Sequence, residues 1–562
     1  MCSTACASRV RDRERIPANS GARGCFSWRK QLPTPIGKPE KSWFVRIMAI
    51  LKRARGFHPR GRDGLHVLEP GDVIGHKAGM ISEGDDVESA FLVFYPDYWQ
   101  TRRLDELRAT DYVYLDVGGH TYLDYAGAGL PSESQISAHA IRLSGNCFGN
   151  PHSHNPTSTN STQLVEQTRA RILAYFNASA DEYVVIFTPN ATGACRLVGE
   201  AYGFDRETRF VLTLDNHSSV NGIREFARGR GAQSEYVPMR GPELRTRTDD
   251  VRAALANGPK GLFAFPAQSN FSGVQHPMDW IDLAHENGYD VLLDAAGYVA
   301  TNRLDLSVVH PDFIPVSWYK VFGYPTGVGC LIARREALAR LRRPWFAGGT
   351  VQASSAQGDW HILADNEMAF EDGTLNFLAI PDVMAGIDWV EHIGIDMIHQ
   401  RVSCLTGWLL DCLQELRHTN GRPMVEIYGP CGTTGRGGTI AFNFRDPDGR
   451  IIDERVVQHD SGAVGISLRT GCFCNPGASE VAFLLDRDTL VEMDGKRVGT
   501  LNDFGTFDDI LRVIGMPSGG AIRVSVGLAS NIADVERFLR FAEATYRDRH
   551  PSAEGLEVRM HC

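Results

Sequence analysis

The chain has 562 residues, of which 43% are hydrophobic and 22% charged, and its formal net charge is −10. This length and composition indicate a globular protein larger than one ordinary domain. The negative charge argues against nucleic acid as a main partner, because phosphate backbones bind basic surfaces. No apolar run reaches the roughly 18–20 residues of a membrane helix, so we expect no membrane partner. The 12 cysteines are scattered, which is typical of reduced thiols in a cytoplasmic protein.

The amino-terminal part of the chain differs from the rest. Its first 65 residues or so are rich in arginine and lysine and show no sustained periodicity. They lack the long apolar region of a secretory signal, so a disordered arm, another targeting segment and an untranslated extension stay open. We predict an N-terminal extension over 1–90 that is disordered.

Between about residues 110 and 380, short apolar strands alternate with amphipathic helices. Most of the strand candidates are apolar without alternation, as expected of strands that helices cover on both faces. This pattern predicts an α/β fold with a doubly wound, mostly parallel sheet over 91–380. The expected strands are Tyr183–Phe187, Phe210–Leu214, Leu262–Phe265, Asp290–Leu293, Phe313–Val316 and Val328–Ile332, and the expected helices are Ser161–Phe176, Cys195–Tyr202, Val220–Arg228, Trp280–Asn287 and Arg335–Leu341.

The pattern of expected helices and strands changes after about residue 380. One long helical stretch is expected over Ile380–Leu416, and a final helix over Ile532–Arg547. Between them lie the strand candidates Thr439–Phe444 and Ala521–Val526. We therefore expect a smaller α+β domain over 381–550 and a tail over 551–562.

Lys320 and Asp294 are the most informative residues. Lys320 follows an apolar strand and precedes a glycine-rich turn, and Asp294 ends the strand before it. Pyridoxal 5′-phosphate needs such a pair: the lysine amine forms a Schiff base, and the aspartate keeps the pyridine nitrogen protonated so that the ring takes up electrons. The pair predicts a pyridoxal phosphate enzyme.

Polar residues follow three further strands at the edge where open α/β sheets bind ligands. Thr192 and the backbone amides at the start of its helix could hold a phosphate. His217 could stack on a flat ring, and Asn270 could donate to a ring hydroxyl. Each signal is weak alone, because a helix cap or a loop histidine is common, but together they indicate one cofactor site.

These residues belong to motifs that resemble the class V aminotransferase family of pyridoxal phosphate enzymes, which includes the cysteine desulfurases. The likeness is greatest to the amino-terminal domain of molybdenum cofactor sulfurases, and it covers about 115–545. It implies a fold-type I transferase. The matching motifs begin at Tyr122, Gly149, Asp294, Ser317, Phe370 and Arg469, and read YLDYAGAG, GNPHS, DAA, SWYKVFGYPTG, FEDGT and RTGCFCNPG.

The resemblance implies roles for particular residues. Lys320 would carry the cofactor, Asp294 would pair with its ring nitrogen, and His217 would lie over the ring. Arg523 would clamp a substrate carboxylate, for which a planar guanidinium is suited. Thr374 would reach the neighbouring subunit's phosphate, which implies a homodimer. Asn270 would lie near the ring hydroxyl, Thr192 and Ser317 would bind the phosphate, and no metal is implied.

Cys474 matches the nucleophile of the desulfurases. Its thiolate would take sulfur from the substrate and become a persulfide. The glycine, proline and asparagine around it predict an exposed loop, which favours a reactive over a structural thiol. Cys472 could be a relay or resolving partner, and spacing alone leaves open which of the two is the primary nucleophile.

Several departures from the expected patterns bear on the function. Gly297 stands where many desulfurases have glutamine, and Tyr319 where they have histidine; both favour the molybdenum cofactor sulfurase branch. That branch usually continues into a carboxyl-terminal cofactor-recognition domain, which a separate partner would have to supply here. A further cysteine expected near the CFCNPG motif is replaced by Ser479.

The sequence thus predicts a dimeric, cytoplasmic, pyridoxal phosphate-dependent sulfurtransferase that takes sulfur from L-cysteine as a persulfide on Cys474. The acceptor would be the molybdenum cofactor or a partner protein. Two alternatives stay open: an aminotransferase, epimerase or lyase that acts on another amino acid, and a sulfur-carrier or scaffold protein without turnover.

Overall fold

The computed structural model describes residues 87–559 apart from 152, 486, 489, 491–505 and 517. The predicted disorder over 1–90 therefore falls almost wholly outside the described residues. Within the described ranges, no helix combines the length and the apolarity that crossing a membrane requires.

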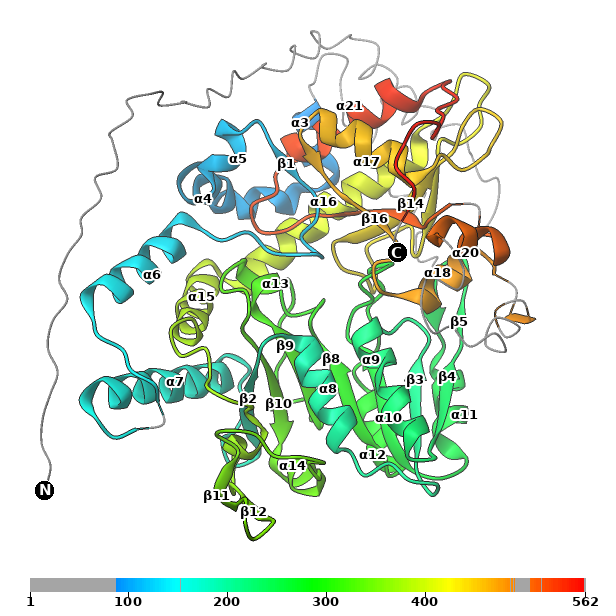
Figure 1. The fold of residues 1–562 in the computed structure, drawn as a ribbon. Coiled ribbons are helices and arrows are strands. Elements are labelled where there is room, and N and C mark those ends of the chain that lie inside the picture. The colour runs from blue at the N-terminus through cyan, green and yellow to red at the C-terminus, as the bar shows by residue number, and fades with distance from the viewer. Residues whose placement is uncertain are drawn as a thin grey trace, which may run out of the picture. The chain divides into compact units, whose positions relative to one another are not determined.

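A seven-stranded sheet forms the lower part of the structure (Figure 1). Its strand order is β2-β10-β9-β8-β7-β3-β4, and within this sheet only β10 runs antiparallel to its neighbours. The predicted α/β class with a mostly parallel sheet is confirmed. The strands are β2 (Tyr183–Thr188), β3 (Arg209–Thr213), β4 (Gln233–Val237), β7 (Gly261–Pro266), β8 (Asp290–Asp294), β9 (Phe313–Ser317) and β10 (Gly329–Arg334).

Helices cover both faces of this sheet because successive strand residues point to opposite sides. Val184 and Ile186 pack in a core with α8, α10 and α14, whereas Val185 packs in a second core with α7, α11 and α12. The strands other than the edge strand β4 are therefore apolar along most of their length. The helices are α7 (Pro156–Tyr175), α8 (Ala191–Ala201), α9 (Ser218–Asn221), α10 (Ile223–Gly229), α11 (Thr248–Ala256), α12 (Trp280–Glu286), α13 (Trp318–Phe322) and α14 (Arg335–Arg340).

A four-stranded antiparallel sheet lies above the large one in Figure 1, in the order β13-β14-β17-β16. Phe442 of β14 and Val524 of β17 pack in the same core as Leu405 of α16 and Phe538 of α21. The elements are β13 (Val425–Tyr428), β14 (Thr439–Phe444), β15 (Ile466–Ser467), β16 (Arg469–Gly471), β17 (Ala521–Ser525), α15 (Ile380–Ile393), α16 (Ile395–Glu415), α17 (Glu454–Ala463), α18 (Pro476–Ala482), α20 (Phe507–Val513) and α21 (Ile532–Tyr546).

The segment 87–122 packs against this part of the chain. Buried Arg401 of α16 donates to Asp105 and to Thr101, and its guanidinium lies 4.1 Å from the ring centre of Tyr98. β1 pairs in parallel with β15. The remaining elements are α3 (Val87–Phe94), η2 (Pro96–Thr101), α4 (Arg103–Asp111), α5 (Val113–Val117), β1 (Thr121–Tyr122), α6 (Glu133–Gly145), β5 (Met239–Arg240), β6 (Arg245–Thr246), β11 (Val351–Ser355), β12 (Trp360–Leu363) and η3 (Glu367–Phe370).

Some details differ from the sequence prediction. The helix expected over Val220–Arg228 is two short helices, α9 and α10, with Gly222 between them. The single long helix expected over Ile380–Leu416 is two helices, because Gly394 between them adopts a φ of 98°, which only glycine tolerates readily. The edge strand β4 was not predicted, since most of its residues are exposed and polar.

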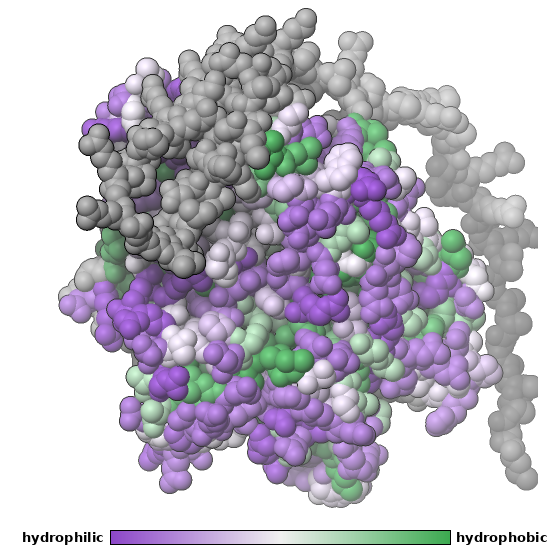
Figure 2. Space-filling model, turned by 180° about the vertical axis from the view of Figure 1, so that it is seen from behind, coloured by the Kyte–Doolittle hydropathy of each residue, from purple (hydrophilic) through white to green (hydrophobic). Residues whose placement is uncertain are grey.

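The face seen in Figure 2 is mostly hydrophilic, with small, separate hydrophobic areas.

Candidate active site

A cavity of about 250 Å³ lies where strands of the large sheet end. Open α/β sheets bind ligands at this edge, because the loops after neighbouring parallel strands meet there. The chain segments that line it follow β2, β3, β7, β8 and β9. Among the residues predicted from the sequence, the cavity brings together Thr192, His217, Asn270, Asp294, Ser317 and Lys320.

The lysine and the aspartate stand at the ends of adjacent strands. Lys320 lies on the short helix α13 directly after β9, and Asp294 is the last residue of β8. Burial lowers the pKa of the Lys320 amine, while the charge of Asp294 opposes this shift. A lowered pKa favours the neutral amine, which is the form that attacks a carbonyl carbon.

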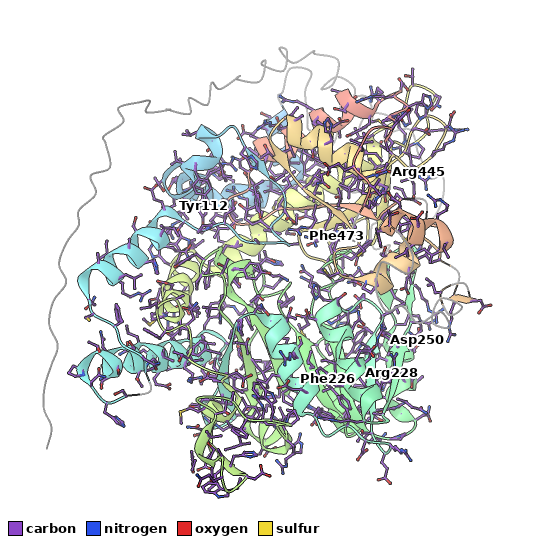
Figure 3. All side chains as sticks on the ribbon, viewed as in Figure 1. Tyr112, Phe226, Arg228, Asp250, Arg445 and Phe473 are labelled. Carbon is purple, nitrogen blue, oxygen red and sulfur yellow. The ribbon has the colours of Figure 1, made fainter. Side chains whose placement is uncertain are left out.

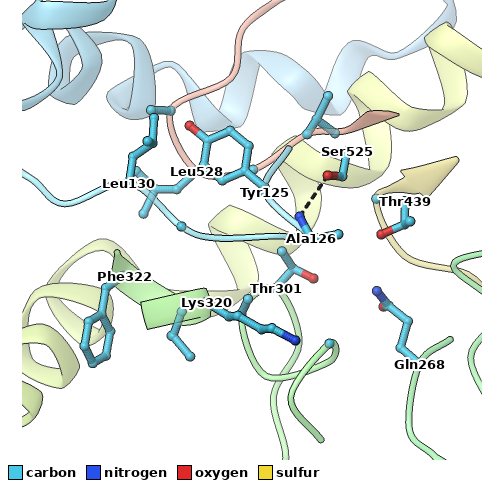
Figure 4. Close-up of a pocket in the computed structure, with 18 of the residues that line it drawn as sticks. Tyr125, Ala126, Leu130, Gln268, Thr301, Lys320, Phe322, Thr439, Ser525 and Leu528 are labelled. Carbon is cyan, nitrogen blue, oxygen red and sulfur yellow. Dashed lines mark hydrogen bonds between the residues drawn. The ribbon is translucent and has the colours of Figure 1, made fainter. Parts of the chain in front are cut away.

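The helix that carries the lysine is held by close backbone contacts. The Gly129 amide donates to the Tyr319 carbonyl at 3.0 Å. A side chain at Gly129 would place its Cβ 2.9 Å from the Gly323 nitrogen, so the motif needs glycine there. Figure 4 shows Tyr125 and Leu130 on one side of Lys320, around a second cavity of about 40 Å³. Lys320 therefore lines both cavities.

Hydroxyl groups converge on the amino-terminal end of α8. The Thr192 Oγ1 lies 2.7 Å from the Ser219 Oγ, and the Ala191 amide donates to the Ser317 Oγ at 3.0 Å. The helix dipole makes such an end favourable for an anion. Ser219 was missed from the sequence, although it lies two residues after His217. This set of donors fits a phosphate group.

His217 caps helix α9 with its ring. Its Nδ1 accepts a hydrogen bond from the Ser219 amide at 3.1 Å, so the ring proton of the neutral form sits on Nε2. Burial and the nearby charge of Lys320 lower the pKa of His217 from 6.5 to about 4. The ring is therefore neutral at pH 7, and a neutral flat ring suits a position against an aromatic cofactor.

The two cysteines of the CFCNPG motif differ in state. Cys474 is an exposed free thiol, whereas Cys472 is held in a disulfide. The Cys474 carbonyl accepts a hydrogen bond from the Ser218 amide at 2.7 Å, next to His217. Figure 3 shows Phe473, the residue between the two cysteines, in the region between the two sheets. The loop of Cys474 is thus bonded to Ser218, whose neighbours His217 and Ser219 line the cavity of Lys320, although Cys474 itself does not line it.

Arg523 is buried in a cluster with a carboxylate and a second arginine. Its Nη2 donates to the Asp124 Oδ1 at 2.9 Å, and the other oxygen of Asp124 accepts from the Arg469 Nη2 at 2.7 Å. The Arg523 Nε is buried without a hydrogen-bond partner. Two guanidinium groups on one carboxylate leave a surplus positive charge, which suits an anionic substrate group. Asp124 and Arg469 lie in motifs quoted above, but no role was predicted for either.

Thr374 does not line the cavity of Lys320. It lines a neighbouring cavity of about 310 Å³, and Asn150 donates to its hydroxyl at 3.3 Å. The space that Gly297 leaves beside the lysine is bordered by Gln268, whose carbonyl would lie 3.2 Å from a Cβ at residue 297.

The donor set therefore fits pyridoxal phosphate: an amine of lowered pKa, a carboxylate at the next strand end, a neutral ring and an anion site share one cavity. On a doubly wound sheet this arrangement defines the fold-type I class of pyridoxal phosphate enzymes. The model of the aminotransferase class-V family matches residues 121–538, and the chain belongs to this family. The family and fold predicted from the sequence are confirmed, as is a transferase that uses pyridoxal 5′-phosphate.

Curated relatives resemble most of this chain. It is 37% identical over 467 residues to a molybdenum cofactor sulfurase of Bos taurus, and the aligned region covers 79% of this chain and 52% of the relative. It is 38% identical over 463 residues to the molybdenum cofactor sulfurase of Homo sapiens, and the aligned region covers 78% of this chain and 51% of the relative. The chain therefore spans about half the length of these relatives.

Solved structures support the fold. A cysteine desulfurase from Thermococcus onnurineus aligns with a TM-score of 0.64 at 22% identity and covers 78% of this chain and 97% of its own. A cysteine desulfurase from Escherichia coli aligns with a TM-score of 0.61 at 20% identity and covers 78% of this chain and 98% of its own.

Proposed function

We propose that this chain is a cysteine desulfurase-like sulfurtransferase that takes sulfur from L-cysteine and holds it as a persulfide on Cys474. The observation that carries the proposal is the place of Cys474: an exposed free thiol on a loop bonded to Ser218, beside the cavity of Lys320. The curated relatives described above are molybdenum cofactor sulfurases, which supports the same chemistry.

The residues divide the work as follows. Arg523 and Arg469 attract the substrate carboxylate, because the single charge of Asp124 neutralises only one of the two guanidinium groups. The Lys320 amine, in its neutral form, accepts the proton from the α-carbon of cysteine at Nζ. Bound pyridoxal phosphate supplies the electron sink that makes this proton removable. His217, which is neutral at pH 7, would lie against the cofactor ring.

The sulfur step is a displacement at the substrate sulfur. The Cys474 thiolate attacks that sulfur, an S–S bond forms, and the bond from sulfur to the β-carbon breaks. The carbon keeps the electron pair and takes up a proton, so the products are alanine and a persulfide on Cys474. No external oxidant is required, because the β-carbon gains the two electrons that the two sulfur atoms of the persulfide lose.

Two substitutions test this function. Lys320→Ala should abolish both alanine release from cysteine and trapping of the cofactor by borohydride, whereas Lys260→Ala, whose amine donates to the Leu255 carbonyl, should change neither. Cys474→Ser should retain the cofactor but lose the persulfide seen by mass spectrometry, with Cys431→Ser as the control at another exposed thiol. Undiminished turnover in Cys474→Ser would exclude the persulfide role. Release of a product other than alanine, in a panel of amino acids, would favour the aminotransferase or lyase reading.

The acceptor, the assembly and the location are part of the same proposal. We infer that the molybdenum cofactor, or a partner protein that carries it, receives the sulfur in the cytoplasm. We also infer a homodimer in which Thr374 reaches the partner's phosphate site, since Thr374 lies outside the cavity of its own Lys320. If sites are shared, mixing Lys320→Ala with Thr374→Ala should restore part of the activity; no restoration would exclude shared sites.

A further inference from the structure

The backbone around Cys474 adopts a conformation that must be held by its surroundings. Phe473 has a φ of 56° and Cys474 a φ of 53°. Two successive residues with side chains in the left-handed region are uncommon, because Cβ then crowds the following carbonyl. Contacts beyond the loop itself therefore decide where the thiol points.

Two asparagine side chains supply those contacts. The Asn270 amide donates to the Phe473 carbonyl at 2.7 Å. The fully buried Asn475 amide donates to the Asp215 carbonyl at 2.7 Å and to the Asn270 Oδ1 at 2.9 Å. With the Ser218 amide on the Cys474 carbonyl at 2.7 Å, the residues on both sides of the thiol are bonded to loops of the large sheet.

The same contacts reach the cofactor cavity. Asn270 lines it, and the Asn270 carbonyl accepts from the Arg523 Nη1 at 3.0 Å. The guanidinium of Arg523 in turn lies 4.6 Å from the ring centre of Phe473. Asp215 and Ser218 flank the stretch that holds His217. A shift of the asparagines would therefore move the thiol relative to Lys320 and Arg523 together.

We propose that Asn270 and Asn475 form an amide bridge that positions the Cys474 thiol over the cofactor cavity for sulfur transfer. Both are positioning residues, and Asn475 touches no reacting atom. This inference rests on the proposed function, and it gives Asn270 a task toward the cysteine loop in addition to the expected one beside the ring hydroxyl. A displacement of about 1 Å in a reacting group can reduce a rate by about 100-fold, so the bridge should matter for turnover.

The test uses variants that remove the bridge but keep the helix cap. The Asn475 Oδ1 caps α18 by accepting from the Ala478 amide at 3.2 Å, and both serine and aspartate can retain that bond. Neither Asn475→Ser nor Asn475→Asp can donate to Asp215 and Asn270 at once. Asn531→Ser is the matched control, since Asn531 caps the distant helix α21 in the same way.

In both Asn475 variants loaded with pyridoxal phosphate, we expect kcat for alanine release to fall about 10-fold or more with KM nearly unchanged. The Ser218 amide, bonded to the Cys474 carbonyl, should lose protection in hydrogen exchange, while the cofactor absorbance stays that of the wild type. Normal kcat or retained protection in either variant would overturn the inference. If the wild type releases no alanine, the proposed function fails, and the exchange of Ser218 still decides whether the bridge holds the loop.

Discussion

Removing the charge of Asp124 should destabilise the protein more than removing a similar charge at the surface. The change Asp124→Asn keeps the size of the side chain but leaves the guanidinium of Arg523 without a counter-charge. The Arg523 side chain is 3% exposed and that of Asp124 is 11% exposed, so water cannot replace the lost partner. The perturbation therefore tests whether this cluster is a buried ion pair in energetic terms.

The expected magnitude follows from the burial of each pair. Breaking a buried pair by removing one partner costs about 3–5 kcal/mol. The Arg469 side chain is 50% exposed, so its pair with Asp124 contributes about 0–1 kcal/mol. Because asparagine still offers an acceptor to Arg523, we expect a loss near the lower limit, about 3 kcal/mol.

Urea unfolding followed by circular dichroism measures this loss. The control is Asp396→Asn, which breaks the exposed pair of Arg303 and Asp396, with side chains 63% and 81% exposed. That change should cost less than about 0.5 kcal/mol. Should Asp124→Asn lie within about 1 kcal/mol of Asp396→Asn, at an unchanged slope against urea, the reasoning from burial is refuted.

Three further predictions follow from single positions. Burial lowers the pKa of His217 from 6.5 to about 4, so between these pH values the unfolded chain binds a proton that the folded chain does not. The free energy of unfolding should therefore fall by up to about 3 kcal/mol as the pH drops from 6.5 to 4. His217→Asn should flatten this part of a pH series of urea midpoints, and an unchanged series would contradict the prediction. Gly477→Ala places a Cβ 2.1 Å from the Leu214 carbonyl oxygen, so turnover should fall about 10-fold or more. In the control Gly462→Ala the new Cβ meets no heavy atom within 4 Å, so turnover should be unchanged. Equal rates in the two variants would refute the close approach. Trp280→Ala removes a fully buried ring stacked on His276 at 5.0 Å and should cost about 3–5 kcal/mol in urea unfolding, and a loss below about 1 kcal/mol would be inconsistent with that packing.

Most of the central sheet could be predicted because its strands, apart from β4, are apolar along most of their length. All of the strands expected before residue 380 form within two residues of the expected bounds, and β14 begins and ends where expected. The edge strand β4 could not be predicted in this way, because a strand that faces solvent carries few apolar residues. The break at Gly394 depends on one backbone angle within an otherwise helical pattern.

The cofactor cavity was predictable for a related reason. In an open parallel sheet, residues just after neighbouring strands meet at one edge whatever the details of packing. The sequence predicted one shared site because its residues end or closely follow strands, and the structure places them in one cavity. They are Thr192, His217, Asn270, Asp294 and Lys320. Their individual roles on the cofactor stay predictions, as does the role of Cys474.

The sequence by itself determined the α/β class, the family and the residues around Lys320, because periodicity and strand ends are local properties of the chain. Only the tertiary structure decided which distant residues bond to each other: Asp124 with Arg523, and Asn270 with Asn475. Such pairs join segments separated by hundreds of residues, and hydrogen bonds and ion pairs form only where the folded path brings a donor within about 3 Å of an acceptor.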